Sequence, residues 1–362
     1  MVLLAQITKK FKKKLRGICL LAEELGVSTA TISRALNPST SHLVKESRRN
    51  QILELADRMR FRPNPGARLI QKGHNSTLGL LIPEQDDVFF SEFYGRLMGG
   101  LIRAVAKTGW EVRINTVVLG EKSVIEEFRR KGLGISGLIY AGFPLTNAQV
   151  DELAGFYSPL ILLSSTLPPE CPMENVKCHV LGVDNYTGAF KAARHILDLG
   201  HKRIGLILGP QTSRDFLDRE HGYRDALAQA GIDWNENMVF RDSFEQDSGR
   251  AGCQFFMAKS EIPEAIICAN DSIAFGVIDQ VKESGLKCPG DISVIGFDDG
   301  PWAAACSPKL TTIRQPLGAL TQHAVSLLKD AVMVSKTRQL ERYFLKAELQ
   351  VRDSTAPAKR RR

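Results

Sequence analysis

The sequence lacks the features of a membrane-spanning or secreted chain. It contains no uninterrupted apolar run of about 18 residues, the length that a membrane-spanning helix needs. The short apolar segment 1–7 precedes the lysine-rich segment 9–14, which reverses the charge order of a secretory signal. With 43% hydrophobic, 24% charged and 7% aromatic residues, the composition is that of a soluble globular protein, not of a disordered one. We therefore expect a cytoplasmic protein with no membrane partner.

Cysteine and histidine are few and scattered. The seven cysteines form no Cys-x-x-Cys pair, and the seven histidines show no metal-ligand spacing such as His-Glu-x-x-His. Cys268 lies in an apolar run and is expected to be a buried thiol. Catalytic motifs are missing too: no Gly-x-Ser-x-Gly elbow occurs, and the one Gly-x-Gly-x-x-Gly match, at 132–137, precedes a strand-like segment instead of following one. We expect no metal, no cofactor and no catalytic residue.

The positive charge is concentrated at the two ends of the chain. The formal net charge of the 362-residue chain is +8 at neutral pH. Residues 1–76 carry 15 Lys and Arg against 5 Asp and Glu, a net charge of +10, whereas residues 77–358 carry −6 and residues 359–362 carry +4. Because a basic segment neutralises phosphates and releases their counterions, the first 76 residues have the charge expected of a nucleic-acid-binding module.

The periodicity of residues 17–61 predicts a small all-helical domain. A short amphipathic helix ends at Gly26, and Ser28 is placed to cap a second helix over 29–36. Two short helices joined by such a turn are typical of a helix-turn-helix motif. A third helix is expected over 44–59. Its inward face is expected to consist of Ile52, Leu55, Ala56 and Met59.

The segment that follows is predicted to be a hinge. Asn64 and Pro65 open a helix of about two turns, which is too short to be stable alone and is therefore expected to fold only when something else holds it. The predicted division of the chain is a basic N-terminal extension (1–16), a helix-turn-helix domain (17–61), a hinge helix and linker (62–76), a two-lobed domain (77–352), to which the resemblance described below assigns effector binding and dimerisation, and a basic C-terminal tail (353–362).

The large remainder alternates apolar strand-like runs with amphipathic helices. This alternation is typical of a parallel sheet with helices on both faces. Strands are predicted at 78–82, 111–118, 137–141, 160–163, 180–183, 203–208, 265–268 and 293–296, and helices at 90–107, 121–131 and 316–334. About 280 residues are too many for one core, so we expect two doubly wound α/β lobes with a ligand between them, at the carboxyl ends of the strands.

Ordered motifs over about 300 residues give the chain a specific resemblance. The segments that carry it are LAEELGVSTATISRALN at 21–37, FRPN at 61–64, AR at 67–68, LGLLIP at 78–83, GHKRIG at 200–205, AND at 269–271, SVIGFDD at 293–299 and LTTI at 310–313. The chain resembles the lactose/galactose repressor (LacI/GalR-type) family of bacterial transcription regulators. The resemblance implies a periplasmic-binding-protein-like body, a homodimer on a near-palindromic double-stranded DNA operator, and a small-molecule effector that alters operator affinity. A tetramer is the alternative to the dimer.

The resemblance assigns a set of DNA-binding residues. They are Ser28, Thr29, Ala30, Thr31, Ser33, Arg34, Asn37, Asn64, Ala67, Arg68 and Ile70. Arg34 falls where the recognition helix meets base edges and could make a forked contact to a guanine; the alternative is a plain phosphate contact. Ile70 stands where the family places an apolar wedge in the minor groove, and packing between two hinge helices is the alternative.

The resemblance also assigns effector contacts in the body. They are Phe89, Phe90, Ser164, Arg219, Phe244, Asn270, Asp271 and Asp298. One of the two adjacent phenylalanines is expected to belong to the core instead. Asp271 could equally cap the helix after its strand, and Asp298 with Asp299 could form a turn that satisfies its own backbone.

Several positions depart from the family pattern. Ser164 stands where a strand commonly ends in aspartate, which puts the commonest mode of sugar recognition in doubt. Gly17 to Leu21 replace the usual polar capping sequence of the first helix. The leading hypothesis is a repressor, with a sugar or sugar derivative as effector. The alternatives are an activator, and a cytoplasmic small-molecule-binding protein or carbohydrate enzyme with no operator.

Overall fold

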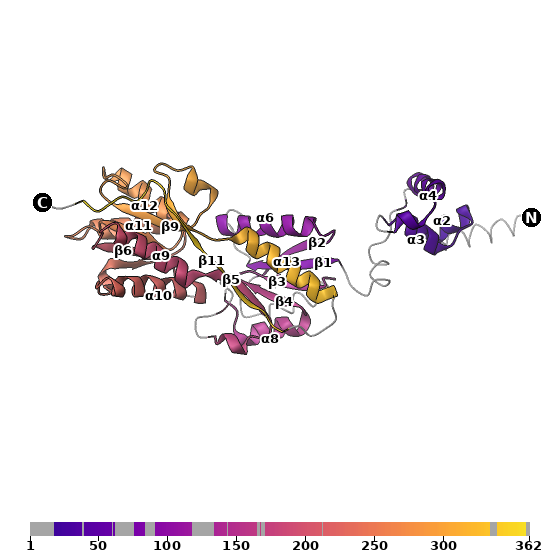
Figure 1. Cartoon of the computed structure of the whole chain (residues 1–362), viewed down its shortest axis with the longest axis horizontal. Helices are drawn as coiled ribbons and strands as arrows, with labels where there is room; N and C mark the ends of the chain where they lie inside the picture. The colour runs from indigo at the N-terminus through magenta and orange to yellow at the C-terminus, as the bar shows by residue number, and fades with distance from the viewer. Residues whose placement is uncertain are drawn as a thin grey trace, which may run out of the picture. The chain divides into compact units, whose positions relative to one another are not determined.

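The protein comprises two compact units, Met1–Asn75 and Ser76–Arg362, here called the head and the body. The computed structural model describes residues 18–37, 40–59, 61, 76–83, 91–117, 134–142, 144–164, 167, 171–211, 213–333 and 339–359 (Figure 1). Among these residues, no helix combines the length and apolar character needed to cross a membrane. The predicted hinge helix, the helix predicted at 121–131 and the N-terminal extension lie outside the described residues.

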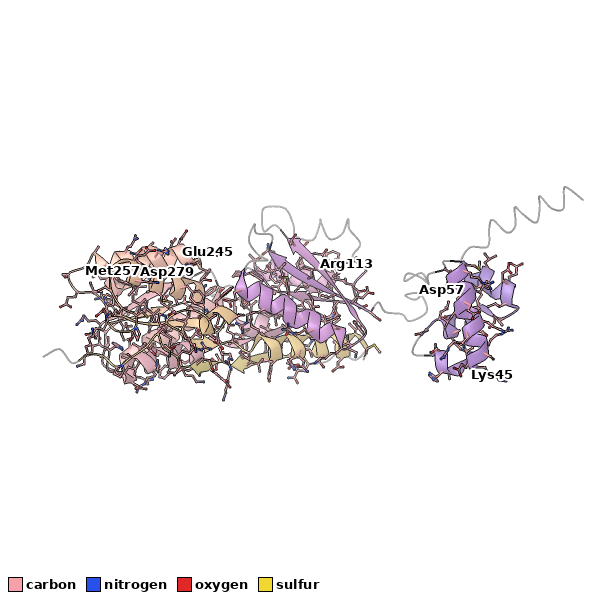
Figure 2. All side chains as sticks on the ribbon, turned by 90° about the horizontal axis from the view of Figure 1, so that it is seen from above. Lys45, Asp57, Arg113, Glu245, Met257 and Asp279 are labelled. Carbon is pink, nitrogen blue, oxygen red and sulfur yellow. The ribbon has the colours of Figure 1, made fainter. Side chains whose placement is uncertain are left out.

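The head contains the three predicted helices. They are α2 (Ile18–Leu25), α3 (Thr29–Ala35) and α4 (Glu46–Arg58), with a 3-10 turn, η1 (Ser41–Leu43), before the last. Gly26 adopts a φ of 60°, which ends α2, and Ser28 caps α3 as predicted, its Oγ accepting the backbone N–H of Thr31 at 3.1 Å. Figure 2 labels Lys45 and Asp57, which lie near the two ends of α4.

A small apolar core holds the head together. Its buried members are Leu21, Ala22, Ile32, Ala35, Ile52 and Ala56, of which Leu21, Ile32 and Ile52 are fully buried. The prediction for Met59 was wrong: it caps the C-terminus of α4 and is 36% exposed, because the helix ends before Met59 can turn inward.

Lobe 1 of the body is built on a six-stranded parallel sheet in the order β11-β5-β4-β3-β1-β2. The strands are β1 (Thr77–Pro83), β2 (Glu111–Val117), β3 (Gly137–Tyr140), β4 (Leu160–Leu163), β5 (His179–Asp184) and β11 (Arg342–Lys346). Ile139 packs in one core with α6 (Glu92–Ala106) and α13 (Leu317–Met333), whereas its neighbours Leu138 and Tyr140 pack in another with α8 (Asn147–Phe156). Side chains alternate across a strand, so these two cores show that both faces of the sheet are covered.

Lobe 2 repeats this architecture with the order β12-β10-β9-β8-β6-β7. The strands are β6 (Ile204–Leu208), β7 (Val239–Arg241), β8 (Ala265–Cys268), β9 (Ser293–Asp298), β10 (Thr311–Arg314) and β12 (Glu348–Gln350). All pairs are parallel except β12 with β10. The helices are α9 (Asn185–Asp198), α10 (Arg214–Gln229), α11 (Gln246–Met257) and α12 (Asp271–Glu283).

The lobe 2 helices pack in two pairs, α9 with α10 and α11 with α12, one pair on each face of the sheet (Figure 1). Figure 2 labels Glu245 and Met257, which bracket α11, and Asp279 of α12 beside them. Cys268 is fully buried in β8, as predicted. The predicted class, an α-helical head with a body of two doubly wound α/β lobes, is confirmed.

The chain crosses between the lobes three times. The crossings follow β5, at Asp184, β10, before α13, and β11, at Lys346. Each crossing leads directly from an element of one sheet into an element packed on the other lobe. Three short, neighbouring crossings restrict the lobes to hinge-like movement relative to each other.

The predicted end of the body, at residue 352, was wrong. Residues 353–359 do not form a separate tail, since Ser354 is fully buried and exchanges hydrogen bonds with Val294 of β9 at 2.8 and 2.6 Å. Further along, the N–H of Ala358 donates to the carbonyl of Leu199 at 2.8 Å, and Lys359 pairs with Asp291 at 2.7 Å. Lobe 2 therefore extends to Lys359.

Candidate functional site

The recognition helix α3 exposes the residues that were predicted to meet DNA. Ile32 and Ala35 are buried and fix one face of α3 in the core of the head. Thr29, Ala30 and Arg34 are exposed on the outer side. The helix therefore presents a short polar face with one guanidinium group, held by a buried apolar face.

The other described residues of the predicted DNA-binding set have local partners or partial burial. The hydroxyl groups of Ser28 and Thr31 form a hydrogen bond at 2.9 Å, so both side chains stabilise the N-terminus of α3. Ser33 and Asn37 are half-buried. The remaining residues predicted to bind DNA or effector, Asn64, Ala67, Arg68, Ile70, Phe89 and Phe90, lie outside the described residues.

In the body, Ser164 lines a cavity of about 320 Å³. It follows β4 with a backbone φ of 53°, in a region that residues other than glycine rarely adopt. Its N–H donates to the carbonyl of Leu181 at 3.0 Å. Ser164 is 7% exposed, and its Oγ has no hydrogen-bond partner within the described part of the chain. The cavity is lined by Ser164, Leu167, Met173, Val180, Leu181, Gly182, Val183, Asp184, Asn185, Tyr186, Arg214, Asp215, Asp218 and Phe344.

In lobe 1 this cavity is bounded by the end of β4, by most of β5 and by Phe344 of β11, and in lobe 2 by the N-termini of α9 and α10. Arg214, the first residue of α10, closes one side, because its guanidinium donates to the carbonyl of Cys171 at 2.9 Å. Its backbone N–H donates to the carbonyl of Leu167 at 3.1 Å. The cavity is therefore an interlobe site, in the place that parallel α/β lobes use for ligands.

Arg219 is a buried, fully engaged cation. Its Nε donates to Oδ1 of Asn185 at 2.7 Å, and Nη1 donates to the carbonyl of Ala269 at 2.7 Å. Its guanidinium lies 3.8 Å from the centre of the Phe297 ring. Arg219 thus ties β8 and β9 to the crossing that follows β5, and it does not line the cavity.

Phe244 and Asn270 form a connected pair beside it. The Phe244 ring stacks on Phe216 with 4.1 Å between centroids. Asn270 donates from Nδ2 to the carbonyl of Phe244 at 2.9 Å and accepts the N–H of Ile273 at 2.8 Å. Asn270, and not Asp271, is therefore the N-cap of α12, which corrects the alternative considered for Asp271.

The carboxylate of Asp271 accepts hydrogen bonds from two residues of lobe 2. It is 1% exposed, and its two oxygens accept the hydroxyl of Thr312 at 2.5 Å and the N–H of Gly300 at 3.0 Å. Burial, with a further contribution from the negative charge of Asp298, raises the pKa of Asp271 to about 7. Both oxygens thus accept hydrogen bonds from within lobe 2, and Asp271 does not line the cavity at Ser164.

Asp298 ends β9 in a strained conformation, with a φ of 140°. Its side chain accepts a hydrogen bond from Nε2 of Gln315, and burial raises the pKa of its carboxyl group. Asp299 instead forms ion pairs with Arg314 and Arg352, both at 2.5 Å. The two aspartates are therefore held by side chains from elsewhere, and not by a turn that satisfies its own backbone.

Two residues at the start of α6 complete the interlobe contact, and sequence reasoning missed both. Arg96 donates to the carbonyl of Asp298 at 2.8 Å, and Glu92 accepts the backbone N–H of Trp302. Burial, and then the charge of Asp298, raises the pKa of Glu92. A Cβ on Gly300 would collide with the Glu92 carboxylate, so glycine at that position permits this approach. No local sequence signal marks this contact, because its partners lie about 200 residues apart in the chain.

Comparison with known proteins covers both units. A family model described as a periplasmic binding protein-like domain matches residues 193–355. The HTH-type transcriptional repressor CytR of Escherichia coli (strain K12) is 32% identical over 334 residues, which cover 91% of this chain and 93% of that protein. The HTH-type transcriptional regulator GalR of Salmonella typhimurium (strain LT2) is 28% identical, with 85% and 86% covered.

Solved structures share the fold. The lac repressor dimer bound to operator and the anti-inducer ONPF has a TM-score of 0.78 at 22% identity and covers 93% of this chain and 98% of its own. The transcriptional regulator CelR in complex with cellobiose has a TM-score of 0.70 at 24% identity and covers 94% and 100%.

Proposed function

The chain belongs to the lactose/galactose repressor (LacI/GalR-type) family of bacterial transcription regulators, and we propose that it is a repressor whose head reads a near-palindromic DNA operator and whose body binds a small-molecule effector. The observation that carries this proposal is the exposed outer face of α3, with Thr29, Ala30 and Arg34 projecting from a helix whose other face is buried. A capped, anchored helix of this kind can enter the major groove without rearranging.

The proposed contacts of the head follow from this exposure. Arg34 is assigned to a guanine edge, because its forked guanidinium can donate two parallel hydrogen bonds there. Thr29, Ser33 and Asn37 are assigned to the DNA backbone, and Ser28 with Thr31 to the stability of the N-terminus of α3. The family resemblance adds Asn64, Ala67, Arg68 and Ile70, with Ile70 as a wedge in the minor groove.

The body is proposed to transmit effector binding through the relative position of the lobes. Lobe contacts at Arg214 and Arg96 lie on either side of the cleft, and the three crossings provide the hinge. An effector that binds one closure more tightly shifts the population toward it, by no more than its differential affinity for the two closures. Ser164 is the proposed effector contact that lines the cavity, and Phe244 and Asp298 remain proposed contacts on the strand-end loops of lobe 2.

The proposed assembly is a homodimer in the cytoplasm, since two heads are needed to read two half-sites of a near-palindromic operator. No catalytic step is proposed. The relatives found by comparison are transcription regulators, which favours this function over an enzyme or a simple binding protein. Activation in place of repression would use the same contacts and would differ only in where operators lie.

The experiment that tests the assignment of Arg34 compares two substitutions. Operator duplex is selected from a random pool with the full chain, and affinities for it and for a scrambled duplex are measured by fluorescence anisotropy. Arg34→Lys keeps the charge but loses the fork, so it should lower the preference for the selected duplex by roughly tenfold or more while scrambled-duplex affinity holds. Arg34→Ala should lower both.

The assignment would be contradicted if Arg34→Lys left the ratio of the two duplex affinities unchanged. If Arg34→Lys retains the full preference for the selected duplex, Arg34 contacts only phosphate. If the wild-type chain yields no selected duplex at all, the operator-binding function itself is wrong.

A further inference from the structure

The interlobe cavity carries more acidic than basic side chains. Three carboxylates, Asp184, Asp215 and Asp218, line it, and Arg214 is its one guanidinium among the described residues. Arg214 already donates to the neutral carbonyl of Cys171 at 2.9 Å. The guanidinium of Arg214 therefore serves as a contact between the two lobes.

Two of the carboxylates have a local explanation. Asp184 is the N-cap of α9 and accepts the N–H of Thr187 at 2.9 Å. Asp215 lies in the first turn of α10, where a negative charge complements the helix dipole. These two side chains are expected at helix N-termini whether or not a ligand binds.

Asp218 lacks such an explanation. It lies in the second turn of α10, beyond the reach of the helix-terminus effect, and it forms no hydrogen bond or ion pair with any described residue. Burial raises the pKa of Asp218; among the neighbouring charges Arg214 has the largest effect and lowers it, Asp215 and Asp184 raise it, and His221 lowers it. Because Arg214 donates its hydrogen bond to the carbonyl of Cys171, this half-buried carboxylate would gain from a cation that bonds it directly.

Two further features of the wall are suited to a ligand with a cationic group. The buried Oγ of Ser164 has no partner in the described chain and is free to bond a polar group of the ligand. Phe344 is 40% exposed, and its ring packs against Gly182, where a Cβ would lie 3.1 Å from two ring atoms. A partly exposed aromatic ring in the same cavity as three carboxylates favours a cation with apolar edges.

We propose that the effector of this protein is a hydroxylated amine of about monosaccharide size, such as an amino sugar, whose ammonium group is held by Asp218 and whose hydroxyl groups are bonded in part by Ser164. This inference rests on the proposed function, because it names the chemical class that the effector site accepts. The cavity of about 320 Å³ lies at the small end of the range for ligand sites, which suits a single ring.

The test uses the full chain and matched ligand pairs at mildly acidic pH, where the amines are protonated. D-glucosamine, D-galactosamine and D-mannosamine are each compared with the parent hexose and with the N-acetylated sugar, by calorimetry and by the shift in unfolding temperature. At least one amine should bind at least about tenfold more tightly than its two neutral counterparts, as expected for a charge-assisted hydrogen bond.

Three variants assign the preference to named residues. Asp218→Asn should reduce the amine preference to near unity and should not lower the unfolding temperature of the ligand-free protein, because the carboxylate that it removes forms no hydrogen bond or ion pair within the described part of the chain. Asp233→Asn, an exposed carboxylate on the same lobe, is the matched control and should keep the preference. Ser164→Ala should weaken amine and hexose by similar factors.

The proposal is overturned if no amine is preferred over its neutral counterparts, or if Asp218→Asn keeps the preference. Operator affinity is measured on the same preparation. Intact operator binding without an amine preference would refute only the effector class, whereas loss of operator binding would refute the proposed function.

Discussion

At the scale of single residues, the sequence motifs predicted where a polar residue lies along its strand better than they predicted which residues it bonds. The sequence placed Ser164 and Asp298 at the ends of strands, and both lie there. It could not predict that Asp271 turns into lobe 2, because Thr312 and the loop at Gly300 approach it only in the folded protein. The contact of Arg96 with Asp298 could not be predicted from the sequence for the same reason, because the two residues meet only in the folded protein.

Asp271 provides a prediction about pH. Its pKa is raised from 3.8 to about 7, so between these values the folded protein holds a proton on this group that the unfolded chain releases. Its contribution to stability is therefore fully present below about pH 4 and is lost as the pH rises through about 7. Asp271→Asn has no such titration, and like the protonated carboxyl group it presents one acceptor and one donor to Thr312 and Gly300, so its deficit in the free energy of unfolding relative to the wild type should be greatest at the acidic end.

This deficit should shrink as the pH approaches 8, and urea unfolding of both proteins at several pH values measures it. Asp233→Asn serves as the control for loss of one formal charge at an exposed position. A deficit of constant size across the range would mean that burial of Asp271 does not shift its titration.

At the scale of elements, long apolar runs were predicted accurately and short edge strands were not. The run at 160–163 has the same bounds in the structure, since a strand that is buried on both faces needs an unbroken apolar sequence. The strand β7 has three residues, and β11 is largely exposed, so neither shows a distinct pattern. The docking of residues 353–359 depends on backbone hydrogen bonds to β9, which leave no trace in side-chain periodicity.

The cap of α3 gives an element-scale prediction. Ser28→Ala removes the acceptor for the N–H of Thr31 and should destabilise the N-terminus of α3 by about 1 kcal/mol. Amide hydrogen exchange in the full chain should then be roughly fivefold faster in the first turn of α3. Ser33→Ala, in the same helix, removes a hydroxyl that caps nothing and is the control. Equal effects of the two substitutions would show that the cap does not order the recognition helix.

At the scale of the whole molecule, the charge of the sequence divides where the structure divides. The basic residues 1–76 coincide closely with the head unit, and the described body carries the acidic interlobe site. A basic unit can bind phosphates while an acidic body is repelled by them, which directs the chain onto DNA through its head. The basic C-terminal residues were predicted to be a tail, but Lys359 belongs to lobe 2 through Asp291.

Operator recognition by the basic head is tested by the salt dependence of DNA binding. Anisotropy is measured for the full chain with the selected operator and with a scrambled duplex of equal length, over a series of salt concentrations. We expect log affinity to fall linearly with log salt concentration for both duplexes, and the operator to stay preferred by at least about a thousandfold. Equal affinity for the two duplexes, or binding that does not respond to salt, would contradict this expectation.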